Sequence, residues 1–481
     1  MAARTSSSDQ SVVHVLLLPF PTQGHINPLL QFGKRLDARS GVRCTLAATR
    51  FIINSTKPTP SSVHVAAISD GCDERGPDEL GGMGVPYFER IESAGSETLD
   101  ALLLSESELG RPVHVVVYDA FAPWAQRVAR RRGAASAAFL TQPCAVDILY
   151  AHAWTGRVPP PPLLRPKEEE EEEEVLRDLP GLSTQLEVGD VPTFLADTSY
   201  PPCFRELLVN QFLGLDTADH VLVNSFYDLE PQEAEYLAAT WRARMVGPTV
   251  PSAFLDNRLP DDVSYGIHLH VPMAAESKAW LDAQQARSVL YVSFGSMASL
   301  GADQMGEIAE GLYGSGKPFL WVVRATETGK LPEGFADKAR EASRGLLVSW
   351  CPQLEVLAHP AVGCFFTHCG WNSTVEALSA GVPMVAMPDW SDQTTNAKYI
   401  QDVWRVGVRV RPDARGVVRS EEVERCVRDV MEGEMGKEFR NRALDWSGKA
   451  RKAMSEGGSS DVAIADFLSC FGHSTPVTPA N

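Results

Sequence analysis

The sequence lacks any apolar run that approaches the roughly 20 residues needed to span a bilayer as a helix. Basic residues are also scarce: 44 Lys and Arg stand against 62 Asp and Glu, which gives a formal net charge of −18. A chain this acidic binds nucleic acid poorly, because that affinity depends on cations that neutralise phosphates. Anionic membrane surfaces repel it for the same reason. We therefore expect no nucleic-acid partner and no stable insertion in a membrane.

The nine cysteines do not suggest a disulfide framework, because they are odd in number and scattered along the chain. They favour a reducing compartment, and we expect the protein in the cytoplasm. The apolar segment Val12–Phe20 predicts a buried first strand and not the core of a signal peptide, since Pro-Thr-Gln-Gly-His follows it. No Gly-x-Gly-x-x-Gly follows that strand, which argues against an NAD-dependent dehydrogenase.

The chain does contain a regular alternation of short apolar runs and longer helical patterns. Several runs are continuous in Val, Leu and Ala, as expected of parallel strands that are covered on both faces. The predicted strands are Val13–Phe20, Val42–Thr49, Val63–Ile68, Val113–Asp119, Ala134–Leu140, His220–Asn224, Val289–Phe294, Pro318–Val323, Leu346–Ser349, Val362–His368 and Pro383–Met387. The 481 residues exceed a single core of about 250–300 residues. We therefore predict an α/β fold with two Rossmann-like, doubly wound parallel-sheet domains that face a cleft.

Composition marks the domain boundaries. The seven glutamates Glu168–Glu174 indicate a solvated surface insertion, and residues 248–273 lack periodicity, which is typical of a linker. The predicted organisation is a disordered tail (1–10), an N-terminal domain (11–247) with a Pro- and Glu-rich insertion (159–175), the linker (248–273), a C-terminal domain (274–455) and a C-terminal segment (456–481) that packs back on the N-terminal domain. We expect a monomer whose cleft closes between the two domains.

The most informative stretch is Trp350–Gln393. Within it a predicted strand leads through a turn at Gly370 into a helix that Asn372 is expected to cap. A strand, a tight turn and a helix N-terminus make an anion site, because free backbone N–H groups and the positive end of the helix dipole face the ligand. His368, Asn372 and Ser373 add side-chain donors. The pattern predicts a cradle for a diphosphate that has no Walker lysine.

Other side chains of this stretch suit the remaining parts of a nucleotide sugar. Trp350 offers a flat apolar face on which a base can stack. Glu376 lies one helical turn beyond the glycine turn, where its carboxylate could accept both ribose hydroxyls. Asp392 and Gln393 follow the next predicted strand and offer acceptors and a donor for a hexose.

Two simpler interpretations of these residues remain. Cys364, His368 and Cys369 are all metal-ligand types, but no second pair lies nearby in the sequence, which disfavours zinc. Trp350 and Trp371 could be ordinary core aromatics.

Trp350–Gln393 resembles the 44-residue signature box of plant family-1 glycosyltransferases, which use UDP-sugars. The resemblance implies the GT-B arrangement of two such domains, with an acceptor-binding N-terminal domain and a UDP-sugar-binding C-terminal domain. It also implies UDP-glucose as the donor, no metal ion and no bound cofactor. Carried over position by position, it assigns uracil to Trp350 and Gln353, the ribose to Glu376, the diphosphate to Ser296, His368, Asn372 and Ser373, and the sugar to Trp371, Asp392 and Gln393. Gly370 joins this UDP-sugar site because a glycine lets the backbone come close to the ligand.

The first strand leads to a candidate base, His25. Asn27 is expected to cap the following helix with Pro28 as its first residue, which leaves His25 in a loop at the cleft. Asp119 ends another predicted strand and needs a partner there. By accepting from one ring nitrogen it would fix the tautomer and stabilise the imidazolium. A structural histidine, and Asp119 as a helix N-cap, are the alternatives; the segment before His25 resembles that of the family's catalytic His–Asp pair.

The sequence therefore predicts an enzyme of the UDP-glucosyltransferase type. We expect inverting, metal-independent transfer of glucose to a hydroxyl or carboxyl group of a small apolar acceptor. The chain most resembles a subgroup that acts on indole-acetic and salicylic acids and on trichothecene toxins. That resemblance implies a plant hormone, a phenolic, a specialised metabolite or such a toxin as the acceptor. Phe20, Phe121, Phe139 and Trp390 are candidate walls of its pocket. A nucleotide-sugar epimerase or hydrolase and a non-catalytic UDP-sugar-binding protein are the rival hypotheses.

Overall fold

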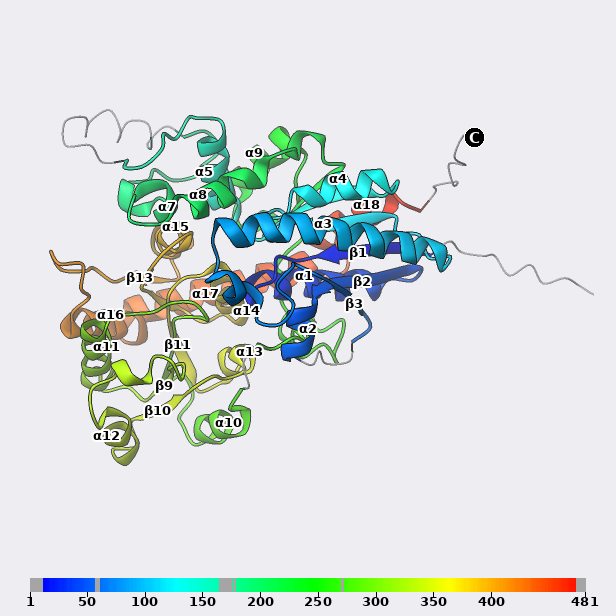
Figure 1. Cartoon of the computed structure of the whole chain (residues 1–481). Coiled ribbons are helices and arrows are strands. Elements are labelled where there is room, and N and C mark those ends of the chain that lie inside the picture. The colour runs from blue at the N-terminus through cyan, green and yellow to red at the C-terminus, as the bar shows by residue number, and fades with distance from the viewer. Residues whose placement is uncertain (1–11, 57–60, 164–175, 177–178, 270–271, 473–481) are drawn as a thin grey trace, which may run out of the picture.

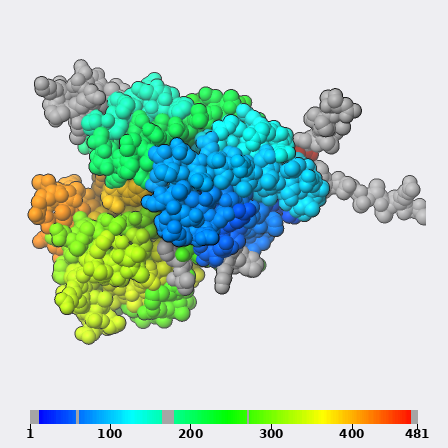
Figure 2. All heavy atoms as spheres, in the orientation of Figure 1, coloured from blue at the N-terminus to red at the C-terminus, as the bar shows by residue number. Residues whose placement is uncertain are grey.

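Two sheet domains lie next to each other with helices packed around each sheet (Figure 1). The computed structural model describes residues 12–56, 61–163, 176, 179–269 and 272–472. The predicted tail 1–10, the glutamate run and all but residues 159–163 of the predicted insertion lie outside the described residues. In the space-filling view the C-terminal domain, yellow to orange, forms a second mass beside the blue-to-green N-terminal domain (Figure 2).

Among the described residues, the N-terminal sheet has seven parallel strands in the order β3-β2-β1-β4-β5-β6-β7. The strands are β1 (Val13–Leu18), β2 (Val42–Thr49), β3 (His64–Ile68), β4 (Val115–Asp119), β5 (Ala135–Leu140), β6 (His220–Val223) and β7 (Arg244–Met245). The helices of this domain are α1 (Gln23–Asp37), α2 (Arg50–Thr56), α3 (Val85–Glu108), α4 (Trp124–Arg131), α5 (Cys144–Trp154), α7 (Thr193–Ala196), α8 (Pro202–Val209) and α9 (Pro231–Trp241).

The C-terminal sheet has six parallel strands within the described ranges, in the order β10-β9-β8-β11-β12-β13. They are β8 (Val289–Ser293), β9 (Phe319–Val322), β10 (Gly345–Val348), β11 (Val362–Thr367), β12 (Met384–Ala386) and β13 (Gly407–Arg409). The helices are α10 (Ala274–Asp282), α11 (Ala302–Gly314), α12 (Phe335–Glu341), α13 (Gln353–Leu357), α14 (Trp371–Ala380), α15 (Gln393–Lys398), α16 (Ser420–Met431), α17 (Gly433–Met454) and α18 (Ser459–Ser469).

Both sheets reverse their strand order at one point, between β1 and β4 and between β8 and β11. Right-handed crossovers then place the helices of the two halves on opposite faces, so each sheet is doubly wound and buried. All six residues of β1 and all six of β11 are buried, as their continuous apolar sequences predict. The two predicted Rossmann-like domains are confirmed. Their reversal points are where such sheets bind ligands, beyond the carboxyl ends of the strands.

Hydrogen bonds join the two domains along α15. Thr394 donates its hydroxyl to the carbonyl of Val191 at 2.7 Å, and Thr395 donates to the carbonyl of Asp190 at 2.6 Å. The guanidinium of Arg409 contacts the Asp190 carboxylate at 2.7 Å. The segment just before α7 is therefore fastened to the C-terminal domain.

The chain returns to the N-terminal domain at its end. The ring of Phe467 in α18 lies 6.2 Å from Phe32 and 5.2 Å from His220, measured between centroids. Ser460 donates its hydroxyl to the carbonyl of Gly247 at 2.5 Å. Residues from the two ends of the sequence thus share one core.

Three sequence-based expectations about local structure are wrong. Strands β7 and β13 were not predicted, because two or three residues are too few to show a pattern. Helix α1 begins at Gln23 after Thr22, so His25 lies in its first turn and not in a loop, Pro28 lies inside the helix, and Asn27 does not cap it. Helix α14 begins at Trp371 after Gly370, so Asn372 is its second residue and not its cap.

Candidate active site

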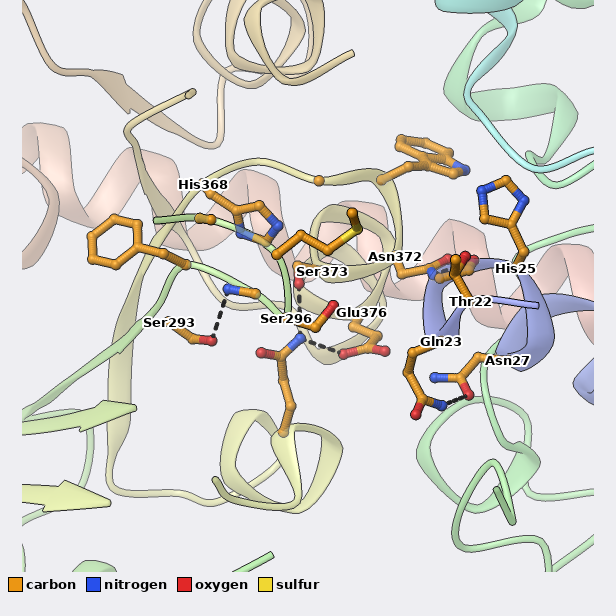
Figure 3. A pocket seen from close by; sticks show the side chains of 18 of the residues that line it. Thr22, Gln23, His25, Asn27, Ser293, Ser296, His368, Asn372, Ser373 and Glu376 are labelled. Carbon is orange, nitrogen blue, oxygen red and sulfur yellow. Dashed lines mark hydrogen bonds between the residues drawn. The ribbon is translucent and has the colours of Figure 1, made fainter. Parts of the chain in front are cut away.

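The two domains enclose a cavity of about 460 Å³ at the carboxyl ends of both sheets. Every predicted site residue except Asp119 lines it. Figure 3 shows His25 and Asn372 near one another, with His368 and Ser296 on the other side of the cavity. The structure therefore brings together side chains that are more than 300 positions apart in the sequence. The role of each remains a prediction.

His25 and Asp119 form a tight pair at the reversal point of the N-terminal sheet. The Nδ1 atom of His25 lies 2.6 Å from Oδ2 of Asp119, whose side chain is fully buried. The other carboxylate oxygen accepts the backbone N–H of Phe121 at 3.0 Å. Since α4 begins at Trp124, Asp119 holds a turn and does not cap a helix. Asp119 thus fixes Nδ1 as a donor and leaves Nε2 free to accept a proton.

The proline inside α1 explains how this helix meets the other domain. Proline has no N–H, and its ring crowds the carbonyl four residues earlier, which here belongs to Gly24. That carbonyl instead accepts the side-chain Nδ2–H of Asn372 at 2.7 Å. The first turn of α1, which carries His25, is thereby joined to the first turn of α14 across the cleft.

His368 lies between two glycines at the reversal point of the C-terminal sheet. A Cβ atom at Gly295 or at Gly370 would come within 2.6 Å of its Nε2 atom. Gly295 also has a φ of +76°, a conformation that favours glycine. Burial lowers the pKa of His368 to about 4, so the ring is neutral at physiological pH.

A polar network occupies the end of the cavity that is predicted to hold the nucleoside. Gln353 donates through Nε2 to Ser373 Oγ at 2.9 Å and to Glu376 Oε2 at 2.8 Å (Figure 3). Its Oε1 accepts the phenol of Tyr291 at 3.0 Å. Tyr265 donates its phenol to Glu376 Oε1 at 2.8 Å. Sequence reasoning missed Tyr265 because it lies in the linker, which shows no pattern.

Hydrogen bonds to neighbouring protein groups fix the side chains that are predicted to contact the sugar. The indole N–H of Trp371 donates to the carbonyl of Asn224 in the other domain at 2.8 Å. The side-chain oxygen of Gln393 accepts the backbone N–H groups of Asp389 and Trp390 at 2.9 and 3.1 Å. Burial raises the pKa of Asp392 to about 6 despite a hydrogen bond from Asn396.

Part of the cavity wall is apolar and aromatic. Phe20, Phe121 and Trp390 line it, as predicted. Phe139 does not: it is fully buried against Phe32, with ring centroids 5.4 Å apart, so its prediction as a wall is wrong. Further walls come from segments that carry no motif, namely Met83, Phe194, Phe204, Leu207 and Leu208. Such walls suit a small apolar molecule with few polar groups.

Comparisons with known proteins agree with this geometry. The family model described as UDP-glucoronosyl and UDP-glucosyl transferase matches residues 245–443. UDP-glucosyltransferase UGT13248 of Hordeum vulgare is 50% identical over 460 residues, which cover 94% of this chain and 93% of the relative. UDP-glycosyltransferase 79 of Oryza sativa is 47% identical, and the match covers 94% of this chain and 96% of the relative. This chain belongs to the UDP-glucosyltransferase family.

Solved structures of other UDP-glucosyltransferases share the fold. The crystal structure of Os79 from O. sativa in complex with UDP has a TM-score of 0.88 and 47% identity, and the match covers 95% of this chain and all of that one. Phytolacca americana UGT2, complexed with UDP-2fluoro-glucose and pterostilbene, has a TM-score of 0.78 at 28% identity. The match covers 96% of this chain and all of that one. The GT-B arrangement is thereby confirmed.

Two further features of this UDP-glucosyltransferase concern metals and membranes. No group of three or more His, Cys, Asp or Glu side chains within the described ranges is placed to hold a metal ion. Burial raises the pKa of the Cys364 and Cys369 thiols well above the usual range. No helix of the described part of the chain is long and apolar enough to cross a membrane.

Proposed function

We propose that this enzyme transfers glucose from UDP-glucose to a small apolar acceptor, with inversion and without a metal ion or bound cofactor. The observation that carries the proposal is the pair His25–Asp119, 2.6 Å apart, in the same cavity as the N-terminus of α14. A proton acceptor on one side and an anion cradle on the other are the two elements that such a transfer needs.

The steps follow from this arrangement. His25 takes the proton of the acceptor hydroxyl on Nε2, and Asp119 stabilises the imidazolium that forms. The acceptor oxygen forms a bond to C1 of glucose from the face opposite UDP, and the bond from C1 to the diphosphate oxygen breaks. The electron pair leaves with the diphosphate, where the helix N-terminus and the donors at Asn372, Ser373 and His368 stabilise the charge. An acceptor that is already a carboxylate needs no base.

Names of relatives support the class of acceptor. Os79 has been solved with a trichothecene and with deoxynivalenol-3-glucoside, and a relative in Arabidopsis thaliana is named as a flavonol 7-O-glucosyltransferase. We propose the same breadth here: a phenolic or other specialised metabolite, a trichothecene toxin or a plant hormone. The roles are conjugation and detoxification, and we expect a cytoplasmic monomer. An epimerase or hydrolase is not favoured, because the relatives are transferases and the cavity has an apolar compartment beside the base.

The test is the His25→Ala variant with UDP-glucose and a panel of hydroxyl and carboxyl acceptors, with product detected by mass. We expect turnover of hydroxyl acceptors to fall about 10²–10⁴-fold while UDP binding is retained. His64→Ala serves as the control, because that histidine is exposed and lies outside the cavity. Normal turnover of a phenol by the His25 variant would contradict the proposed base.

A further inference from the structure

The linker contributes a side chain to the nucleoside end of the cavity. Tyr265 lies in the segment 248–273 and is only 8% exposed. Its phenol donates to Oε1 of Glu376 at 2.8 Å, and Glu376 is 4% exposed. Both side chains line the cavity. Tyr265 is therefore within reach of the carboxylate that is proposed to bind the ribose.

The Glu376 carboxylate is oriented from two sides. Tyr265 donates to Oε1, and Gln353 donates to Oε2 at 2.8 Å. A carboxylate offers about four lone-pair sites, two on each oxygen. One site on each oxygen therefore remains for another donor. Two adjacent ribose hydroxyls match this pair of sites.

The same two bonds favour the charged form of Glu376. Burial raises the pKa of this carboxyl to about 7, and the hydrogen bonds from Gln353 and Tyr265 oppose the rise. A protonated carboxyl loses an acceptor and becomes a poorer partner for hydroxyl groups. Loss of one donor would therefore weaken the site in two ways, by freeing the side chain and by favouring its neutral form.

Tyr265 is itself held in place by α1 of the N-terminal domain. The carboxylate of Asp262, three residues earlier, accepts from Lys34 at 2.9 Å and from Gln31 at 2.5 Å. Two residues later, Gln23 donates to the carbonyl of Ile267 at 2.9 Å. The tyrosine thus lies in a segment anchored to one domain while its hydroxyl contacts the other.

We propose that Tyr265 is a positioning residue for the nucleotide: its phenol orients the Glu376 carboxylate toward the two ribose hydroxyls of the UDP-sugar. The inference rests on the proposed function, since it assumes a uridine nucleotide in this cavity. It makes the linker part of the donor site and connects that site to α1, which carries His25.

The experiment is isothermal titration of the full-length protein with UDP and with 2′,3′-dideoxy-UDP, for the unaltered protein and for Tyr265→Phe. The variant keeps the ring and removes only the hydroxyl. We expect its affinity for UDP to fall about three- to tenfold. Affinity for the dideoxy nucleotide should change by less than about twofold, because that ligand has no hydroxyls for Glu376 to bind.

A pH series gives a second readout. The terminal phosphate of UDP still titrates in part near pH 7, but its ionisation is the same for both proteins at a given pH. The difference in affinity between the variant and the unaltered protein at each pH from 7 to 8.5 therefore reports on the protein. Loss of the phenol raises the pKa of Glu376 further, and the affinity of the variant for UDP should therefore rise more steeply over this interval than that of the unaltered protein.

Tyr87→Phe is the matched control. Tyr87 also donates a buried phenol to a carboxylate, Asp70 at 2.7 Å, but it does not line the cavity. Its removal should leave both nucleotide affinities unchanged.

Three outcomes would overturn the inference. If Tyr265→Phe lost the same affinity for UDP and for the dideoxy nucleotide, the substitution would have disturbed the fold in general. Unchanged or tighter binding of UDP by Tyr265→Phe would mean that the phenol does not support the ribose site. In both cases the unaltered protein still binds UDP and transfers glucose, so the proposed function stands. Failure of the unaltered protein to bind UDP would overturn both.

Discussion

Asp119 uses both of its carboxylate oxygens, one for His25 and one for the backbone N–H of Phe121. The second bond prevents the carboxylate from rotating away from the imidazole. The proposed base, His25, therefore depends on a partner whose side chain is fully buried. Removing the charge of Asp119 changes which nitrogen of the His25 ring carries the proton, and it leaves the shape of the surrounding pocket intact.

The Asp119→Asn variant tests this dependence. The new amide can donate to Nδ1 of His25, which places the ring proton on Nε2 and prevents that atom from accepting another. We expect kcat with a hydroxyl acceptor to fall about 10²–10⁴-fold while the KM for UDP-glucose changes little. Steady-state kinetics with product detected by mass measure both constants. A carboxylate acceptor should be affected much less, and an equal loss for both acceptors would speak against the base.

Helix α1 shows how an irregular element serves the site. Pro28 costs the helix one hydrogen bond, and the carbonyl that it leaves unpaired, at Gly24, accepts from Asn372 of the other domain. The irregularity lies one turn from His25. The proline thus leaves the Gly24 carbonyl available for the hydrogen bond to Asn372.

The Pro28→Ala variant restores an N–H that can bond to the Gly24 carbonyl within the helix. The helix then competes with Asn372 for this acceptor. We expect a higher melting temperature, since proline inside a helix costs about 3 kcal/mol, together with a turnover about three- to tenfold lower. Scanning calorimetry and kinetics at saturating substrates measure the two effects. Higher stability with unchanged turnover would show that the bond across the cleft is dispensable.

In the whole molecule, a buried ion pair attaches the linker to α1. Arg35 donates to both oxygens of Asp256 at 2.8 and 2.7 Å, and Ser252 donates to the same carboxylate at 2.6 Å. Burial by itself would raise the pKa of Asp256, but these hydrogen bonds and the charge of Arg35 outweigh it and lower the pKa. The pair is almost completely buried.

A lowered pKa predicts the pH range in which this pair stabilises the fold. Its contribution is complete above the unfolded value of about 3.9 and is lost as pH falls through the folded value. Asp256→Asn should therefore lower the free energy of unfolding by about 1.5–3 kcal/mol at pH 7. The difference from the unaltered protein should shrink toward pH 3, as measured by denaturant titration. Asp73→Asn, which disrupts the exposed pair with Arg50, should cost less than about 1 kcal/mol.

Much of the fold, and many of the side chains that line the cavity, could be predicted from sequence because the determining residues are close together along the chain. Val13–Leu18 is apolar apart from His14, and Trp350–Gln393 contains most of the predicted donor site in one segment. The start of α1 was misplaced because Asn27-Pro28 is a stronger start signal than Thr22. Tyr265 and the walls formed by Met83, Phe194, Phe204, Leu207 and Leu208 were missed because only folding brings them to the cavity.

The bonds between α15 and the segment before α7 have a consequence for substrate exchange. If the cleft opens without breaking these bonds, the C-terminal domain rotates about α15. Strand β10, at the far edge of its sheet, then moves the furthest. Phe194 and Trp390, whose rings meet at 5.6 Å, lie beside this pivot. We therefore expect the acceptor compartment to keep its shape while nucleotides enter and leave through the gap that widens on the opposite side.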